Sequence, residues 1–421
     1  MRAIPASPRS LLESLFSTAV RATSPHSALP AYLPAETRRP AVVIGAGKAA
    51  ASMAASLEQH WQGALSGLVV TRYGHAEECR HIEVVEAAHP VPDAAGERMA
   101  QRVLGLLEGL RESDLVICLL SGGGSSLLAC PANDISLADK QAINRELLRS
   151  GATISEINCV RKHLSAIKGG RLAQACGPAR LVTYAISDVP GDDPAVIASG
   201  PTVADPTHSA DALAILQRYD IATGEAVGRW LQDPRSETLK PGNSAFANSE
   251  YHLIARPADA LAAAASAARA QGLEVVELGD AIEGEARDVA AHQAAMALEL
   301  QRHARQPTLL LSGGETSVSV RGSGRGGRNA EFLLAVACAL QGASGIYAIA
   351  ADTDGIDGSE DNAGALLAPD SWQRARALGL DARAMLDNND GYGFFEALGD
   401  LLFTGPTRTN VNDFRALLVL P

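Results

Sequence analysis

Four short apolar runs recur in the first half of this 421-residue chain, and each ends near a turn rich in glycine or aspartate. Within each run the apolar residues are continuous rather than alternating, which is typical of strands buried on both faces of a parallel sheet. Candidate helices lie between the runs. The pattern therefore predicts a Rossmann-like, doubly wound α/β domain. The four runs are Ala41–Ile44, Gly67–Val70, Asp114–Leu120 and Leu181–Ile186.

The chain is too long for one core and suits two domains. A polar Pro-Gly segment, Glu237–Asn243, predicts the boundary. We expect an N-terminal Rossmann-like domain over residues 1–240 and a C-terminal α/β domain over 241–421. A capping box at Ser10 and Glu13 predicts a first amphipathic helix. Further strands are expected at Tyr251–Ala255, Leu273–Leu278, Thr308–Leu311 and Gly345–Ala350, with a long helix over residues 257–271.

Composition excludes several classes of partner. The formal charge is −12, from 36 basic and 48 acidic residues, which argues against a nucleic-acid surface. No apolar stretch reaches membrane-spanning length, so no membrane segment is expected. Six cysteines without a C-x-x-C pair suit a reducing compartment, which predicts a cytoplasmic protein.

The turn after the first run reads Gly45-Ala-Gly47-Lys48-Ala-Ala50 and fits the G-x-G-x-x-A dinucleotide pattern. The strand expected from the next run ends Val69-Val70-Thr71-Arg72, where an NAD site would place an acidic residue. Lys48 opens a helix, where a cation opposes the helix dipole. An unfavourable charge beside anion-binding N–H groups suggests a phosphate or carboxylate site. An ordinary exposed lysine in a first turn is the alternative.

A second glycine turn, Ser121–Ser126, offers a nest of backbone N–H groups for an anion. Its structural alternative is a tight strand-to-helix turn. The segment Asn158–Leu172 is the densest basic run; as one helix it would place Arg161, Ser165 and Lys168 on a polar face. That face is either an ordinary solvated surface or a surface turned towards an anionic substrate.

The second half carries a similar turn, Ser312-Gly313-Gly314-Glu315-Thr316, again after an apolar run. The glycine- and arginine-rich segment Arg321–Glu331 follows. Glycine lets the backbone approach a ligand closely, and arginine binds phosphate or carboxylate through a bidentate fork. The segment predicts a site for a polyanionic small molecule, whereas a solvated flexible turn is the alternative.

Two acidic loops follow apolar runs. Asp188 and Asp192 lie in the first loop, and Asp352-Thr-Asp354-Gly lies in the second. Carboxylates at the carboxyl ends of strands in open α/β sheets are placed for catalysis or metal binding, and Mg²⁺ prefers such oxygen ligands. Aspartate is also a common turn former, which is the alternative for these residues.

Taken in order, these stretches resemble the class II glycerate kinases, also called the glycerate 2-kinase family. The resemblance covers about residues 10–415 and rests on the ordered set rather than on any single motif. The matching stretches are Gly45–Lys48, His89–Asp93, Ser121–Ser125, Arg161–His163, Lys168–Arg171, Ser187–Asp192, Ser199–Thr202, Ser312–Thr316, Gly326–Asn329 with Glu331, and Asp352–Gly358.

The resemblance implies two domains with the active site in the cleft between them. It implies ATP- and Mg²⁺-dependent phosphorylation of D-glycerate, to 2-phosphoglycerate, by a monomer or homodimer. Members have also been labelled hydroxypyruvate reductases, so an NAD(P)H-dependent reductase is the alternative activity. Family and residue chemistry together nominate Lys48, Arg325, Arg328 and Asp188 as catalytic residues.

The same reasoning nominates a wider set of residues for binding. The expected metal ligands are Asp188, Asp192 and Asp354. The expected substrate- or phosphate-binding residues are Gly45, Gly47, Ser121, Gly122, Gly123, Gly124, Ser125, Arg161, Lys168, Ser312, Gly313, Gly314, Glu315 and Asn329.

Overall fold

The computed structural model describes residues 7–421 and divides the chain into two compact units. One unit spans Ala28–Ile254, and the other joins the N-terminal segment through Ser27 to Ala255–Pro421. This division differs from the predicted boundary after residue 240. The Pro-Gly segment belongs to the first unit because Leu239 pairs through its backbone with Gly169 and Asp205. The two units are described separately below as the N unit and the C unit.

The N unit is built on a six-stranded sheet with the order β3-β2-β1-β4-β5-β6. Neighbouring strands from β3 to β5 are parallel, and the inner strands are buried on both faces, as their continuous apolar runs predict. The predicted doubly wound fold is therefore confirmed. The strands are β1 (Ala41–Ala46), β2 (Leu65–Arg72), β3 (Glu83–Ala87), β4 (Leu115–Leu120), β5 (Arg180–Ile186) and β6 (Ser249–Ala255).

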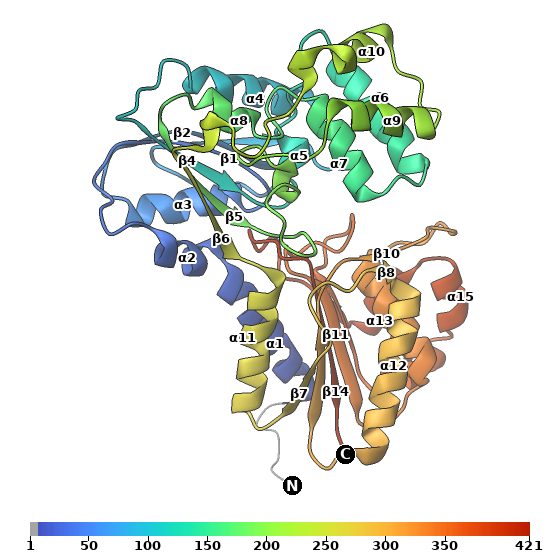
Figure 1. Cartoon of the computed structure of the whole chain (residues 1–421). Helices are drawn as coiled ribbons and strands as arrows, with labels where there is room; N and C mark the ends of the chain where they lie inside the picture. Colours follow the sequence, from blue (N-terminus) through green and yellow to red (C-terminus); the bar gives the residue numbers. More distant parts are fainter. Residues whose placement is uncertain (1–6) are drawn as a thin grey trace. The chain divides into compact units, whose positions relative to one another are not determined.

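Helices cover both faces of this sheet, with α3 on one face and α4 and α8 on the other (Figure 1). A separate group of helices, α6, α7, α9 and α10, packs around its own apolar core. The helices are α3 (Ala50–His60), α4 (Ala94–Leu106), α5 (Gly124–Leu127), α6 (Leu137–Arg149), α7 (Ile154–His163), α8 (Arg171–Ala175), α9 (Ser209–Arg218) and α10 (Glu225–Gln232). The short helix α2 (Pro25–Ala28) spans the boundary between the two units after Ser27.

The single helix expected over residues 158–172 is wrong. Helix α7 ends at His163, and a new short helix begins only at Arg171. Between them, Ser165 forms a β-bridge with Pro131, and Gly169 and Gly170 take left-handed backbone angles. Arg161 and Lys168 therefore do not share a helix face. The two glycines lie six and seven residues after His163, and their positive φ keeps the intervening segment from continuing as one helix into α8.

The C unit is built on a mixed six-stranded sheet with the order β13-β12-β11-β14-β9-β7. Strand β14 runs antiparallel to both of its neighbours, β11 and β9, so its amino end lies beside their carboxyl ends. The strands of the unit are β7 (Glu274–Glu277), β8 (Gly284–Glu285), β9 (Thr308–Ser312), β10 (Thr316–Ser317), β11 (Ile346–Asp352), β12 (Gly364–Leu367), β13 (Leu401–Leu402) and β14 (Asp413–Val419).

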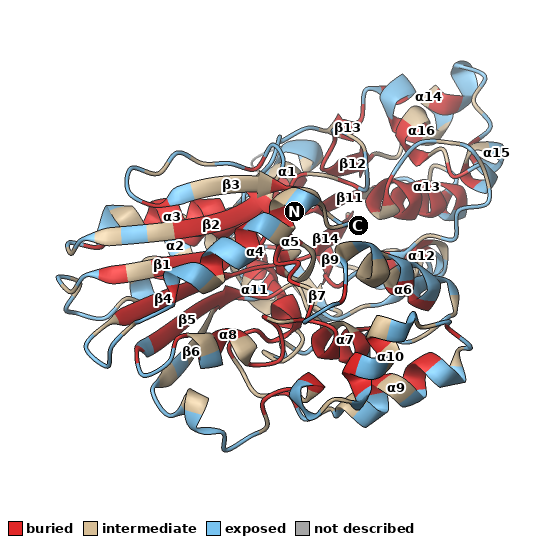
Figure 2. Ribbon diagram, turned by 90° about the horizontal axis from the view of Figure 1, so that it is seen from above, coloured by how far each residue is buried: buried red, intermediate tan, exposed pale blue. Residues whose placement is uncertain are grey.

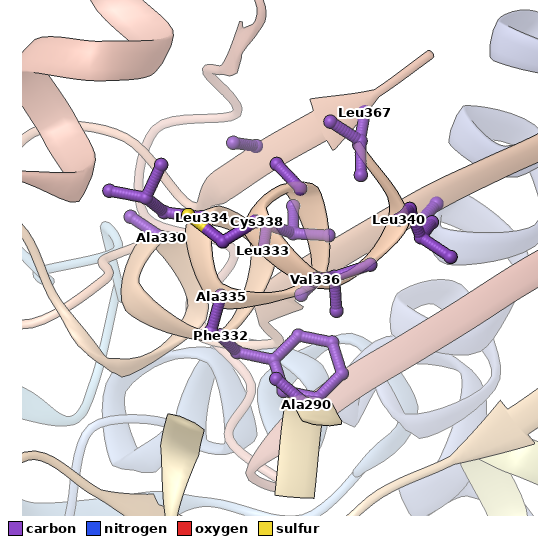
Figure 3. Close-up of a cluster of buried hydrophobic side chains, with 14 of the residues drawn as sticks. Ala290, Ala330, Phe332, Leu333, Leu334, Ala335, Val336, Cys338, Leu340 and Leu367 are labelled. Atoms are coloured by element: carbon purple, nitrogen blue, oxygen red, sulfur yellow. The ribbon is translucent and has the colours of Figure 1, made fainter. Parts of the chain in front are cut away.

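Two layers of helices enclose this sheet, α1 and α11 on one face and α12 and α13 on the other (Figure 1). Helix α13 is buried along almost its whole length (Figure 2). Figure 3 shows its apolar residues with Ala290 of α12 and Leu367 of β12. The helices are α1 (Pro8–Thr23), α11 (Pro257–Ala270), α12 (Ala286–His303), α13 (Arg328–Leu340), α14 (Ser371–Ala377), α15 (Ala382–Asp387) and α16 (Gly391–Leu398).

Helix α1 belongs to the C unit although it opens the chain. Its apolar face is buried there, and the ring of Phe16 lies 5.7 Å from that of Phe414 on β14. The helix begins at Pro8, and the side chain of Ser7 caps it by accepting a hydrogen bond from the Ser10 N–H. The amphipathic helix is thus confirmed, while the capping box predicted at Ser10 is wrong.

Candidate active site

Two glycine turns of the N unit meet at the point where the strand order reverses. In the order β3-β2-β1-β4-β5-β6 this point lies between β1 and β4, and ligands of open α/β sheets bind outside the carboxyl ends of such strands. The turn at Gly45–Lys48 follows β1, and the turn at Ser121–Ser126 follows β4. The fold therefore brings together two of the turns that the sequence nominated.

The two turns interlock through the close approach of Gly47 and Ser121. A Cβ atom at Gly47 would lie 2.1 Å from Ser121 Oγ, so only glycine fits there. The amide of Lys48 donates to the carbonyl of Gly122 (2.9 Å), and the amide of Ala49 donates to Ser121 Oγ (3.0 Å). The amides of Gly47 and Ala50 also bond within the unit. A dinucleotide site needs these amides for a pyrophosphate, so its key donors are already occupied.

The Ser121–Ser126 turn also lies beside two further nominated stretches. A Cβ at Gly123, whose φ is +80°, would meet the His89 ring at 2.9 Å and Lys48 Cγ at 3.5 Å. Ser125 Oγ lies 2.8 Å from Ser199 Oγ. Lys48, the turn after β4, His89 and the Ser199 turn thus converge at one edge of the sheet.

The loop after β5 carries the two aspartates predicted to bind a metal. Asp192 has a left-handed φ of +57°, and its Oδ1 atom is buried without a hydrogen-bond partner among the described residues. Left-handed angles in non-glycine residues are costly and often mark functional sites. The neighbouring Asp193 was not predicted to bind a metal. Its carboxylate accepts a hydrogen bond from the Ala195 amide, as is typical of an aspartate that forms a turn.

Basic side chains of the N unit lie around the short helix α5. Lys168 is buried and donates from Nζ to the carbonyl of Leu128, at the end of α5 (2.9 Å). Arg161 donates to the side-chain oxygen of Asn144 (2.7 Å). Burial lowers the pKa of Lys168 well below its usual value, and the neighbouring cations Lys140 and Arg161 lower it further. Lys140 was not nominated from the sequence.

In the C unit, the Ser312–Glu315 turn follows β9 and is tied to the start of β14. The Gly313 carbonyl accepts from the buried guanidinium of Arg415 (2.6 Å), and the Gly314 carbonyl accepts from the amide of Asp413 (3.1 Å). Ser312 is buried and bonds to Gln293 of α12 (3.0 Å). The hydroxyl of Ser312 therefore has a structural partner.

Arg328 is enclosed by carboxylates. Its guanidinium contacts Asp352 (2.7 Å), Asp413 (2.8 Å) and Glu315 (3.2 Å), one through each nitrogen. Burial favours the neutral form, but Asp413, Asp352 and Glu315 outweigh it and raise the pKa of Arg328 well above its ordinary value. The sequence did not reveal Asp413, because only antiparallel pairing brings the start of β14 beside the ends of β9 and β11.

Arg325 is in a different setting from Arg328. It is 56% exposed, pairs with Glu360 (2.6 Å) and stacks its guanidinium 4.2 Å above the ring centre of Tyr392. The stacking and the ion pair orient the group, while its exposure keeps it accessible to an anion. Arg325 therefore retains the character expected of an anion contact.

Asn329 and two aspartates complete the strand-end cluster of the C unit. The side chain of Asn329 donates a hydrogen bond to Asp413 (2.8 Å), and its backbone N–H donates to Asp357 (3.0 Å). Asp357 therefore caps the amino end of α13. Asp354 accepts the amide of Ile356 within its own turn (2.9 Å). Burial raises the pKa of Asp357 to about 6, against the lowering effect of the Asn329 and Ala330 amides.

A small pocket lies on the glycine-rich segment of the C unit. It encloses about 250 Å³ and is lined by Thr316, Arg328, Glu331, Asn389 and the surrounding glycines and valines. Glu331 forms an ion pair with Arg287 (2.5 Å) and accepts a hydrogen bond from Asn389 (3.1 Å). The motif residue Glu331 thus anchors the segment rather than standing open to solvent.

The described residues fit a weakly held divalent cation better than a resident metal. Residues 7–421 contain no group of three or more His, Cys, Asp or Glu side chains arranged to hold a metal. The orphaned carboxylate oxygen of Asp192 offers one oxygen ligand. Mg²⁺ that enters with substrate phosphates needs only one or two protein carboxylates, so the residues present fit such an ion. Among the same residues, no helix is both long and apolar enough to cross a membrane.

Fold and candidate site together define an α/β protein of two units with glycine turns at the ends of its strands. Comparison with known proteins identifies the family. The Domain of unknown function (DUF4147) model matches residues 11–232, and the MOFRL family model matches residues 308–413. D-glycerate 2-kinase of Thermotoga maritima is 40% identical over 97% of this chain and 98% of its own.

Two further comparisons agree over almost the whole chain. A crystal structure of glycerate kinase from Thermotoga maritima superposes with a TM-score of 0.88 at 39% identity, covering 99% of this chain and 100% of that one. A protein of Agrobacterium vitis, provisionally named hydroxypyruvate reductase, is 54% identical over 98% of this chain and 95% of its own. The chain belongs to the glycerate kinase family.

Proposed function

We propose that this protein is a glycerate 2-kinase, which transfers a phosphoryl group from ATP to the 2-hydroxyl of D-glycerate. The observation that carries the proposal is the similarity to D-glycerate 2-kinase of Thermotoga maritima over 97% of the chain. The interlocked turns of the N unit support it, because they place Lys48 beside the Gly123 turn at the strand-order reversal.

Phosphoryl transfer needs in-line positioning and positive charge on the moving group rather than covalent chemistry by the protein. Lys48 supplies that charge from the carboxyl end of β1. The turn Gly122–Ser125 lies directly beside Lys48, and its backbone binds the anionic oxygens of the transferred group. Preorganised donors of this kind stabilise charge that develops in the transition state.

The aspartates after β5 provide the metal-binding and proton-accepting part of the proposed site. Asp192 contributes its orphaned oxygen to Mg²⁺, with Asp188 in the same loop as the second ligand or as the acceptor of the hydroxyl proton. When bound, Mg²⁺ supplies positive charge that neutralises the ATP phosphates. We expect Asp192→Asn to raise the Mg²⁺ concentration for half-maximal rate without loss of folding.

In the C unit we assign different roles to the two arginines. Arg325, exposed and held against Tyr392, is the group that contacts an anionic substrate. Arg328 positions the strand-end carboxylates Asp352 and Glu315, because its three nitrogens are all committed to acids. Asn329 and Asp354 complete this acidic end of the sheet.

The competing activity, reduction of hydroxypyruvate by NAD(P)H, draws support only from the name of the Agrobacterium vitis relatives. The Gly45–Ala50 turn resembles a dinucleotide motif in sequence, but its amides are occupied within the unit. Strand β2 ends at Arg72 and presents no acid for a ribose hydroxyl. Both observations favour the kinase.

The test is a pair of assays on one purified sample. The first contains D-glycerate, ATP and Mg²⁺, with ADP release followed in time and the phosphoglycerate isomer identified by NMR. The second contains hydroxypyruvate with NADH or NADPH, followed by absorbance. Mg²⁺-dependent ADP and 2-phosphoglycerate with a flat second assay support the proposal. Oxidation of the reduced cofactor without ADP would make it wrong, and an otherwise identical Lys48→Ala sample controls for contaminating kinases.

A further inference from the structure

Three basic side chains of the N unit lie close together without an acidic partner. Lys140 lies on α6, Arg161 lies on α7, and Lys168 lies in the turn between α7 and α8. Arg161 and Lys168 bond only to neutral oxygens, those of asparagine side chains and of the Leu128 carbonyl. Among the described residues, none of the three forms an ion pair with a carboxylate. In a chain of net charge −12, such a cluster is not explained by the overall composition.

Lys140 is the most unusual member of the cluster. Its stem is partly exposed, but its Nζ atom is buried and has no hydrogen-bond partner among the described residues. Taking an ammonium group out of water without a partner costs several kcal/mol. A group kept in this condition therefore points to a counter-charge that binds from outside the chain.

The position of the cluster connects it to the proposed site. Lys168 holds the carbonyl at the carboxyl end of α5, and α5 begins in the Ser121–Ser126 turn. Helix α5 has only 4 residues, so its two ends are roughly 6 Å apart. Helices α6 and α7 pack against each other (Figure 1). Lys140 on α6 and Arg161 on α7 are close enough to interact electrostatically.

We propose that Lys140, Arg161 and Lys168 form a buried subsite for one oxyanion group of a ligand. The chemistry is that of a carboxylate or phosphate, which accepts several charge-assisted hydrogen bonds at once. Only the identity of the ligand that carries this oxyanion group rests on the proposed function. Under that function the group is either the carboxylate of the hydroxy acid or a phosphate of the nucleotide.

Protonation gives a signature that a purely structural lysine would lack. The pKa of Lys140 is lowered to about 8, chiefly by burial; Arg161 and Arg171 contribute to the lowering, and Cys130 and Glu97 act in the opposite direction. At pH 8 the amine is then partly neutral. An entering oxyanion stabilises the charged form, so binding takes up a proton.

The experiment is isothermal titration of the whole protein with inorganic phosphate at pH 8, in two buffers of different ionisation enthalpy. We compare wild type with Lys140→Met, which keeps the stem and loses the charge. Arg145→Met is the matched control, because Arg145 is an exposed cation on the same helix. Lys140→Arg restores the charge at the site itself.

We expect wild type and Arg145→Met to bind phosphate with proton uptake. Lys140→Met should bind at least about tenfold more weakly and without uptake, and Lys140→Arg should recover most of the affinity. Equal phosphate affinity in wild type and Lys140→Met would overturn the proposal. So would phosphate binding to wild type without a change in protonation. Thermal melting of each variant separates lost binding from lost folding.

Steady-state kinetics then identifies the source of the anion. A rise in KM for D-glycerate alone in Lys140→Met assigns the subsite to the carboxylate, and a rise in KM for ATP alone assigns it to a phosphate. No change in either KM would overturn the subsite as part of the active site. If wild type does not phosphorylate D-glycerate but still binds phosphate through Lys140, the proposed function fails and the subsite stands.

Discussion

The same strand–turn sequence, Leu-Leu-Ser-Gly-Gly, occurs once in each unit and leads to opposite electrostatic settings. In the N unit it follows β4, packs against the Gly45–Lys48 turn, and leads into α5, whose end is bound by Lys168 through a neutral carbonyl. In the C unit it follows β9 and lies beside Arg328, whose guanidinium contacts three carboxylates. A turn motif thus fixes a backbone shape, while the charge around it is set by which strands lie next to it.

The difference separates two kinds of arginine and lysine that look alike in the sequence. Arg161 and Lys168 of the N unit keep binding capacity for an incoming anion, since their protein partners are neutral oxygens. The guanidinium of Arg328 is already paired with three carboxylates of its own chain and has no nitrogen left for a ligand. Substitutions in the N unit should therefore change activity more than stability, and substitution of Arg328 should change stability strongly.

The largest expected effect is on catalysis. We expect Lys48→Ala to lower kcat/KM for D-glycerate by about a hundredfold or more, because a positive contact to the transferred group is lost. Thermal melting should stay close to that of wild type. A kcat/KM within about threefold of wild type would remove Lys48 from the proposed mechanism.

The second effect sharpens the contrast within the C unit. Arg328→Met removes the cation that Asp352 and Asp413 share and leaves Asp413 its ion pair with Arg415, and we expect the free energy of unfolding to fall by about 3 kcal/mol. Arg325→Met is the control, because the guanidinium of Arg325 is exposed. This variant should melt like wild type, while its KM for the anionic substrate rises. Chemical denaturation of both variants tests the distinction. If both were equally stable, the carboxylates around Arg328 would not depend on it.

The third effect tests the interlock of the two turns in the N unit. Gly47→Ala forces a Cβ atom against Ser121 Oγ at a φ of +139°, so we expect a loss of about 1–3 kcal/mol in stability together with a loss of activity. Gly74→Ala is the matched control, since Gly74 has a φ of +79° but open space around it. Similar losses in both variants would attribute the effect to backbone strain rather than to the contact with Ser121.

The smallest effect is a pH dependence from Asp357. Its pKa is raised to about 6 in the folded protein, chiefly by burial, so the folded state binds a proton that the unfolded state releases. The stabilising contribution is therefore complete below the ordinary aspartate pKa of about 3.9 and is lost as pH rises through about 6. The difference in unfolding free energy between wild type and Asp357→Asn should change across this window. A difference that is independent of pH would contradict the raised pKa.

Much of the fold could be predicted because it depends on local patterns. Continuous apolar runs identified the inner strands β1, β2, β4 and β5 of the N unit and β9 and β11 of the C unit, but not β12 and β14. The Pro257–Ala270 helix lies where its alanine-rich segment predicts. The single helix expected over residues 158–172 was wrong. Helix α7 ends at His163, Ser165 pairs with Pro131, and the positive φ of Gly169 and Gly170 separates this segment from α8.

The candidate site was predicted less evenly. The turns at Gly45–Lys48 and Ser121–Ser126 were recognised individually, and the strand order β2-β1-β4 then brought them together. Asp413 and Lys140 carried no sequence signal. Asp413 gains its role from antiparallel pairing of the final strand, and Lys140 from the packing of α6 near the end of α5.

The sequence by itself determined the class of fold, the strand-end turns and the family, because these follow from residue patterns within short windows. Only the tertiary structure decided what the charged residues in those turns can do. Contacts between residues far apart in the chain occupy the amides of Gly47, Lys48 and Ala49, which a dinucleotide would need. Such contacts also pair Arg328 with three acids. The interaction of a charge depends on distance in space and on burial, and neither can be deduced from separation along the chain.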